Sequence, residues 1–87
     1  MLNQTEAEFI DSVDWKKDPD TGRTYAWWQF NEHTVVELSS HAAGGHVYIV
    51  QLGSQEYINT RSYEQFQRAL DEINQMTHEQ ISSYLVP

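Results

Sequence analysis

The stretch YAWWQF, residues 25–30, decides how this chain is organised. Four of its six residues are aromatic, and aromatic side chains favour β-strands. In a strand, successive side chains point to opposite faces of the sheet. Trp28 and Phe30 would therefore face one side, and Tyr25 and Trp27 the other. One face suits a hydrophobic core, whereas the other requires cover by another element or a binding partner.

A turn precedes this strand and three extended runs follow it. Residues 18–22 (DPDTG) combine the proline, aspartate and glycine that favour tight turns. The flanking residues 15–17 and 23–25 are suited to pair as a hairpin. The three later runs lie at residues 34–40, 46–52 and 55–60. They are rich in β-branched and aromatic residues, so the middle of the chain is expected to form an antiparallel β-meander of three to four strands.

Both ends of the chain are expected to be helical. Thr5 and Glu8 match a capping box, which predicts a first helix that ends near Asp14. Further capping-box patterns begin at Ser62 and at Thr77, and apolar residues follow the former at spacings of three and four. The predicted order is αββββαα. Helices on one face of an antiparallel sheet make this an α+β fold.

Length and composition favour a single domain spanning residues 1–87. The chain has no cysteine, which removes disulfides and thiolate chemistry. It contains no apolar run of about 18 residues, and its start lacks the basic and apolar regions of a signal peptide. These features favour a cytoplasmic protein, located in the host cytoplasm if a phage encodes it.

The net charge is −8, from 13 acidic and 5 basic residues. This sign argues against direct binding to nucleic acid or to an anionic membrane, because phosphate binding depends on Lys and Arg. One interpretation is that the charge maintains solubility. The other is that the protein binds a basic protein surface, including one that normally holds DNA or RNA.

Side-chain alternation predicts which face of the sheet meets the helices. The core-facing set is expected to be Trp28, Phe30, Val36, Leu38, Val50 and Leu52. The second face would then present Tyr25, Trp27, Val35, Val47, Ile49 and Tyr57. Exposed apolar patches of this kind usually mark an interface. Three arrangements remain open: the N-terminal helix covers this face, two copies stack on each other, or a different protein binds there.

Catalytic and metal-binding patterns are missing from the sequence. The four histidines do not have the spacing of a zinc site. Asp18 and Asp20 resemble half of a calcium loop, but the twelfth position holds Gln29 instead of glutamate. No Gly-x-Ser-x-Gly nucleophile motif occurs. We therefore predict that the protein is not an enzyme and has no metal or cofactor.

The sequence instead predicts a small acidic protein-binding inhibitor or regulator. Its partner would be a protein with a basic, nucleic-acid-handling surface, and a homodimer is also considered. The expected binding residues are Tyr25, Trp27, Trp28, Asp18, Asp20, Glu32, Glu37 and Glu56. Small acidic domains without cysteine are common among phage anti-defence proteins such as anti-CRISPRs. Alternatives are an antitoxin or immunity protein, a homodimeric accessory subunit and, less favoured, a small ligand-binding domain or enzyme.

Overall fold

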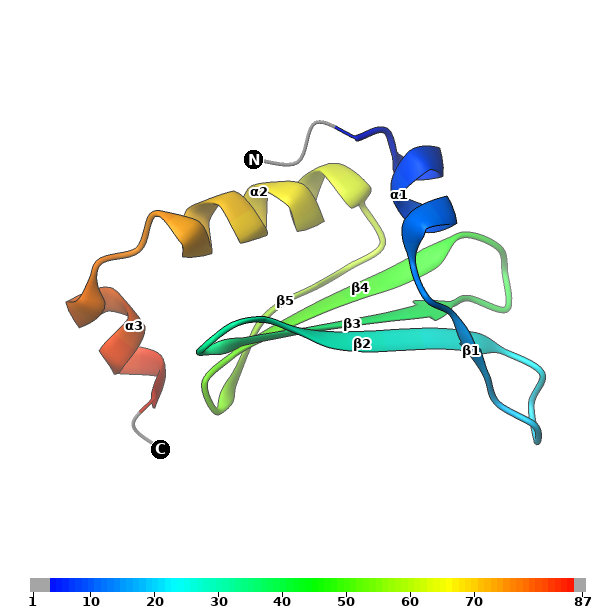
Figure 1. Cartoon of the computed structure of the whole chain (residues 1–87), viewed down its shortest axis with the longest axis horizontal. Helices are drawn as coiled ribbons and strands as arrows, with labels where there is room; N and C mark the ends of the chain where they lie inside the picture. The colour runs from blue at the N-terminus through cyan, green and yellow to red at the C-terminus, as the bar shows by residue number, and fades with distance from the viewer. Residues whose placement is uncertain (1–3, 86–87) are drawn as a thin grey trace.

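The computed structural model describes residues 4–85, in which three helices surround one face and one end of a five-stranded sheet (Figure 1). The elements are α1 (Glu6–Ser12), β1 (Lys16–Lys17), β2 (Thr24–Asn31), β3 (Thr34–Ser40), β4 (His46–Leu52), β5 (Gln55–Thr60), α2 (Tyr63–Asn74) and α3 (His78–Leu85). Each strand pairs antiparallel with its sequence neighbour, in the order β1-β2-β3-β4-β5. The predicted α+β class and antiparallel meander are confirmed.

The predicted number of three to four strands is wrong, and the observed order is αβββββαα. The additional strand is β1, whose two lysines pair with Thr24 and Tyr25. A strand of two charged residues has no hydrophobic periodicity, so the pairing of β1 with β2 depends on the turn that joins them. In that turn Asp18 accepts a hydrogen bond at its Oδ1 from the backbone N–H of Asp20, at 2.8 Å. The backbone N–H of Asp18 also donates to the carbonyl of Arg23, at 2.8 Å.

Capping residues determine where the three helices begin. Thr5 and Glu8 form the reciprocal capping box of α1. Ser62 accepts the Gln65 backbone N–H at the start of α2. Before α3, the Thr77 hydroxyl accepts a hydrogen bond from the Gln80 backbone N–H, and the Gln80 side chain accepts one from the Thr77 backbone. All three predicted helix starts are confirmed because these local pairs satisfy backbone groups that the helix itself leaves free.

The core lies between the sheet and α2, with Phe66 of α2 fully buried at its centre. Phe66 stacks on Tyr48 of β4, with ring centroids 4.8 Å apart, and also contacts Phe9 of α1 at 5.5 Å. The sheet register places one row of apolar residues beneath this cluster, at Trp28, Val36, Val50 and Ile58. The predicted core-facing side of the sheet is confirmed, although Trp28 and Phe30 are half-buried rather than fully buried.

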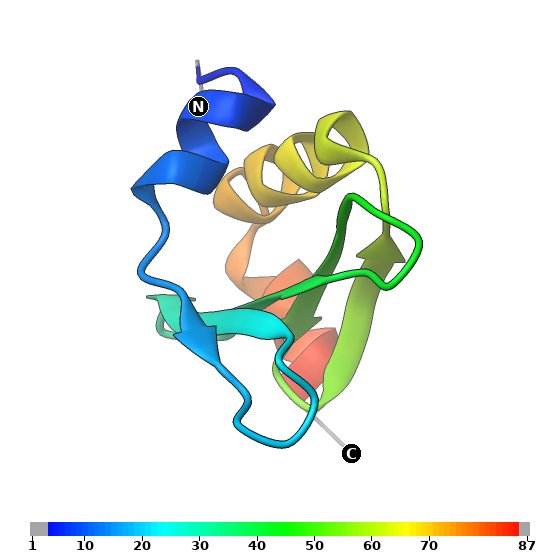
Figure 2. The same cartoon turned by 90° about the vertical axis from the view of Figure 1, so that its right-hand side faces the viewer.

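Helix α1 lies beside α2 on this same face of the sheet (Figures 1 and 2). Its Phe9 contacts the rings of Trp28, Tyr63 and Phe66. The Tyr48 hydroxyl also donates to the Glu6 carboxylate at 2.8 Å, which joins β4 to α1. The arrangement in which the N-terminal helix covers the second face is therefore wrong, because the apolar side of α1 joins the core that α2 already occupies.

Tyr57 does not lie on the second face of the sheet, contrary to expectation. The pairing of β4 with β5 shifts by one residue: Val50 is opposite Ile58, whereas Gln51 is opposite Glu56. A β-bulge of this kind leaves one residue unpaired and redirects its side chain. Tyr57 turns toward the helices, where its hydroxyl donates to Glu72 of α2 at 2.9 Å.

Helix α3 sits at the end of the sheet where β4 turns into β5 (Figure 1). The backbone N–H of Ser54 donates to the carbonyl of Tyr84, at 3.3 Å. Gly53 adopts a positive φ of 62°, and a Cβ at this position would lie 2.5 Å from the Tyr84 carbonyl oxygen. A glycine is required here both for the turn and for the close approach of α3.

Candidate functional site

The face of the sheet opposite α1 and α2, which we call the open face, is crossed by no helix among residues 4–85 (Figure 1). Residues paired directly across neighbouring antiparallel strands share a face. Its three rows are Tyr25, Ser39 and Val47; Trp27, Glu37, Ile49 and Asn59; and Gln29, Val35, Gln51 and Glu56. Tyr25 and Trp27 are 42% and 66% exposed. Two large aromatic side chains of β2 are thus left open to solvent on a face that also carries polar residues.

Trp27 lies in the second of these three rows, on β2, directly opposite Glu37 of β3. A hollow of about 270 Å³ opens beside it, lined by Tyr25, Trp27, Glu37, Ser39 and Ile49 together with the strand residues Ala26 and Leu38. Glu37 is half-buried. Its carboxylate makes no hydrogen bond or ion pair with another residue of the described chain, so it remains available to a ligand.

Trp28 is separated from Tyr25 and Trp27, with which it was expected to form one set of binding anchors. Its side chain is on the core face, with its ring centroid 6.1 Å from that of Phe9. There it lines a different hollow, of about 350 Å³, between α1 and the outer edge of β2, where Trp27 also contributes to the lining. Adjacent strand residues cannot present their side chains on the same face. The open face therefore has two aromatic anchors instead of three.

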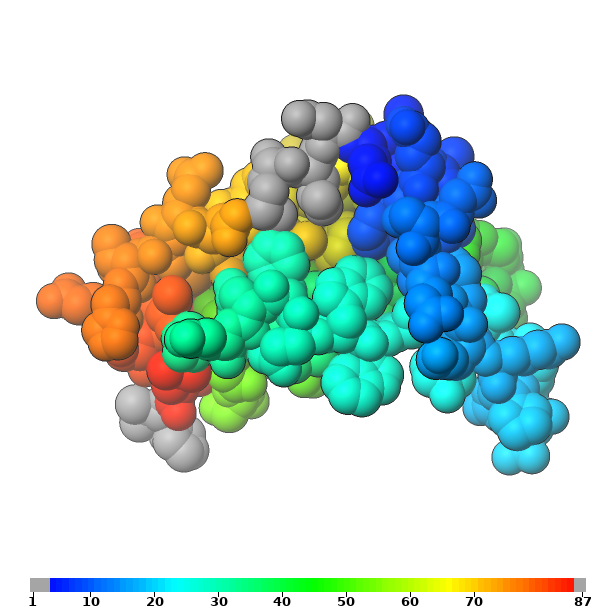
Figure 3. Space-filling model, viewed as in Figure 1, coloured from blue at the N-terminus to red at the C-terminus, as the bar shows by residue number. Residues whose placement is uncertain are grey.

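The outer edge of β2 is another accessible part of the molecule. Strand β1 begins at Lys16, opposite Tyr25, whereas β2 continues past Tyr25 to Asn31. Within residues 4–85, no strand pairs with this edge beyond Tyr25. Figure 3 shows the β2 side chains along the front of the molecule, with the α1–β1 segment covering only one end. Trp27 is consequently accessible both from the open face and from the outer edge of β2.

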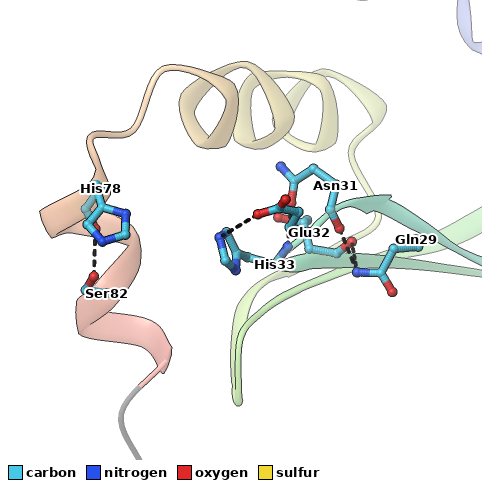
Figure 4. Close-up of polar contacts among 7 residues, drawn as sticks. Gln29, Asn31, Glu32, His33, His78 and Ser82 are labelled. Atoms are coloured by element: carbon cyan, nitrogen blue, oxygen red, sulfur yellow. Dashed lines mark hydrogen bonds and ion pairs between the residues drawn. The ribbon is translucent and has the colours of Figure 1, made fainter.

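The five acidic residues that were expected to guide binding do not form one surface. Glu37 and Glu56 are on the open face. Asp18 and Asp20 lie in the turn between β1 and β2, where the Asp18 carboxylate stabilises the turn itself. Glu32 lies in the turn between β2 and β3, with its carboxylate oxygen 3.7 Å from His33 Nε2 (Figure 4). Only Glu37 and Glu56 can act together with the exposed aromatic residues.

The helices hold most of the negative charge, a feature that sequence reasoning missed. Seven of the 13 acidic residues are in α1, α2 and α3: Glu6, Glu8, Asp11, Glu64, Asp71, Glu72 and Glu79. Arg68 is the one basic residue of these helices. By contrast, β1 and its turn contain Lys16, Lys17 and Arg23. The strongly acidic side and the aromatic side of the molecule are therefore different surfaces.

The histidines are dispersed among separate local environments. His33 lies beside Glu32, and the backbone carbonyl of His78 accepts the Ser82 hydroxyl at 2.8 Å (Figure 4). His41 accepts the Ala43 backbone N–H at its Nδ1, and the His46 ring lies 5.3 Å from the Trp15 ring. Among the described residues, no three side chains of the types that bind metal are grouped closely enough to hold an ion.

Comparison with models of protein families, with curated proteins and with solved structures finds no match to this chain.

Three tyrosines with raised pKa values are on the helical side of the sheet. Burial, together with the hydrogen bond to Glu72, raises the pKa of Tyr57 to about 12. Burial and the Glu6 carboxylate raise the pKa of Tyr48 further, and burial raises that of Tyr63. A hydroxyl that donates to a carboxylate is stabilised in its protonated form. Tyr48 and Tyr57 therefore act as structural donors that connect the strands to the helices, whereas Tyr63 of α2 donates to the Gln4 carbonyl.

No helix in the described part of the chain is long and apolar enough to cross a membrane.

Proposed function

We propose that this protein is a regulator that binds a basic protein surface through the open face, with Trp27 as its central anchor. The observation that carries the proposal is the 66% exposure of Trp27, which lies at the outer edge of a sheet face that no described helix covers. Trp and Tyr are the residues most enriched at binding hot spots. Burial of a Trp–Tyr pair by a partner would remove a large apolar area from water.

The charge of the chain favours a different protein over a second copy of this one. Two copies stacked open face to open face would bring together the Glu37 and Glu56 carboxylates of both copies. Like charges repel at short range even in physiological salt, where screening acts over roughly 8 Å. A basic partner would instead be attracted, because complementary charge accelerates and orients association. By occupying such a surface, the protein would exclude whatever nucleic acid the surface normally holds and so inhibit its partner.

The experiment compares tagged wild-type protein with two variants, Trp27→Ala and Leu85→Ala. Leu85 is a matched control because it is also a large exposed apolar residue, 41% exposed, but on α3. Each protein is incubated with cell lysate, washed at low and high salt, and analysed by mass spectrometry. We expect wild type and Leu85→Ala to retain one basic protein, with less retained at high salt, and Trp27→Ala to lose it.

Two results would contradict this proposal. Equal capture by Trp27→Ala and wild type would place the binding surface elsewhere. A mass in sedimentation velocity that doubles with concentration for wild type, and not for Trp27→Ala, would show that the open face forms a homodimer.

A further inference from the structure

We infer that the hollow beside Trp27 receives an arginine side chain of the partner, with the guanidinium against the Trp27 ring and paired with the Glu37 carboxylate. This inference rests on the proposed function, since it assumes that the open face is the docking surface. It adds the chemistry that the surface recognises.

The first support is the combination of groups around the hollow. Two aromatic side chains, Tyr25 and Trp27, lie beside one carboxylate, that of Glu37. The negatively polarised face of an aromatic ring attracts cations, and Trp does so most strongly. A carboxylate pairs with a guanidinium through parallel hydrogen bonds. Because Trp27 and Glu37 are directly paired across β2 and β3, one guanidinium can contact both.

The second support is that no basic group of the described chain already fills this role. Lys16 is the nearest candidate on this face, since it pairs with Tyr25. Its Nζ lies 3.2 Å from the Asp14 carboxylate and makes its ion pair there. Glu37 has no such partner, although it is half-buried among apolar residues. A partly buried carboxylate is better stabilised by a cation than by a neutral group.

The size of the hollow and its aromatic lining favour an arginine side chain over other ligands. At about 270 Å³, the hollow is just below the roughly 300–1,000 Å³ of sites for drug-sized ligands. It suits one side chain. Arginine is planar, stacks on aromatic rings and presents several donors in a fixed geometry, whereas lysine is a compact and strongly hydrated charge.

The test is an NMR titration of the ¹⁵N-labelled full chain with N-acetyl-arginine methylamide. The neutral and nearly isosteric N-acetyl-citrulline methylamide is the control ligand. The chain contains three tryptophans, so the indole N–H signal of Trp27 is identified by its loss in Trp27→Ala. One cation–π contact and one exposed ion pair predict weak binding, with a Kd on the order of 10 mM or weaker. Fast-exchange shifts remain measurable in this range.

We expect the arginine derivative to shift the Trp27 indole signal and the citrulline derivative to leave it nearly unchanged. Glu37→Gln should weaken arginine binding by about threefold, as expected for loss of a partly exposed ion pair. Glu56→Gln is the matched control, because Glu56 is on the same face but does not line the hollow. It should bind the probe as wild type does. The amide spectra of both variants report whether the fold is intact.

Equal shifts with both probes, or none with arginine, would overturn the inference. The same holds if Glu37→Gln and Glu56→Gln bind the arginine probe as wild type does. These outcomes are distinguishable from failure of the proposed function. If Trp27→Ala loses the partner while the arginine probe has no effect, the open face docks a protein by other contacts. If Trp27→Ala keeps the partner, the docking surface itself is wrong.

Discussion

The two faces of this sheet are built from the same strands but have opposite surroundings. Trp27 and Trp28 are neighbours in β2, yet Trp28 contacts Phe9 in the core while Trp27 is 66% exposed. On the face that α1 and α2 cover, which we call the covered face, these helices supply aromatic rings to the core. They also supply carboxylates that accept hydrogen bonds from strand tyrosines. On the open face, the only half-buried carboxylate, that of Glu37, has no partner in the described chain. The hydroxyls of Tyr48 and Tyr57 on the covered face have partners within the chain, whereas the Glu37 carboxylate on the open face is left for a partner protein.

The largest expected effect is the difference in unfolding free energy between the Trp28→Ala and Trp27→Ala variants. Trp28→Ala should lower the free energy of unfolding by about 3 kcal/mol, the low end for a truncated core Trp, because Trp28 is half-buried. Trp27→Ala should change it by less than about 0.5 kcal/mol, as expected for a surface substitution. Urea denaturation followed by circular dichroism measures both values. An equal loss of stability in the two variants would mean that Trp27 also belongs to the core and that the faces do not differ.

Alkaline pH should lower the stability of the fold through the tyrosines that lie between the sheet and the helices. The folded-state pKa of Tyr57 is raised to about 12 from the ordinary value of 10.0. The unfolded chain therefore loses this proton first, so the stability contribution is fully present below pH 10 and is lost as pH rises toward 12. Tyr48 and Tyr63 act in the same direction. Melting temperature measured as a function of pH should fall in this interval.

Tyr57→Phe tests the origin of that fall, because it removes the titrating hydroxyl and the hydrogen bond to Glu72. The variant should lose less stability than wild type between pH 10 and pH 12. Identical pH profiles for wild type and Tyr57→Phe would show that the Tyr57 hydroxyl is not held in its protonated form by the helical side.

The smallest expected effect concerns Thr34, the one fully buried polar residue of the core within residues 4–85. Its hydroxyl oxygen has no hydrogen-bond partner among the described residues. Thr34→Val replaces the hydroxyl with a methyl group of similar shape and should raise the free energy of unfolding by about 1 kcal/mol. A higher melting temperature in calorimetry would confirm this. A decrease would show that the hydroxyl has a partner in solution, such as a buried water molecule.

Local chemistry made several parts of the fold predictable. The capping hydrogen bonds at Thr5, Ser62 and Thr77 join residues three positions apart, so a short window of sequence contains the whole interaction. The turn at residues 18–22 is likewise local. The separation of Trp27 from Trp28 follows from the alternation of side chains in any strand. These features required no knowledge of the rest of the chain.

Other features depend on contacts that no local pattern contains. The bulge that turns Tyr57 toward Glu72 arises from the pairing of β4 with β5. Strand β1 is an exception: the hairpin between residues 15–17 and 23–25 was predicted from the turn and is confirmed, although its two lysines have no hydrophobic pattern. The position of α1 was undetermined, because an amphipathic helix packs equally well on either face of a sheet until the partner side chains are known. Phe9 packs against Phe66 and Tyr63 of α2, which places α1 on the same face as α2.

The sequence by itself determined the element types, the helix starts and the alternation that puts Tyr25 and Trp27 on one side of β2. These properties depend on the covalent geometry of neighbouring residues and on short-range hydrogen bonds. Only the tertiary structure decided which face is covered, which acidic residues accompany the aromatic ones, and that Glu37 lies beside Trp27. Those outcomes depend on strand register and helix packing, where residues distant in the chain compete for the same apolar surface.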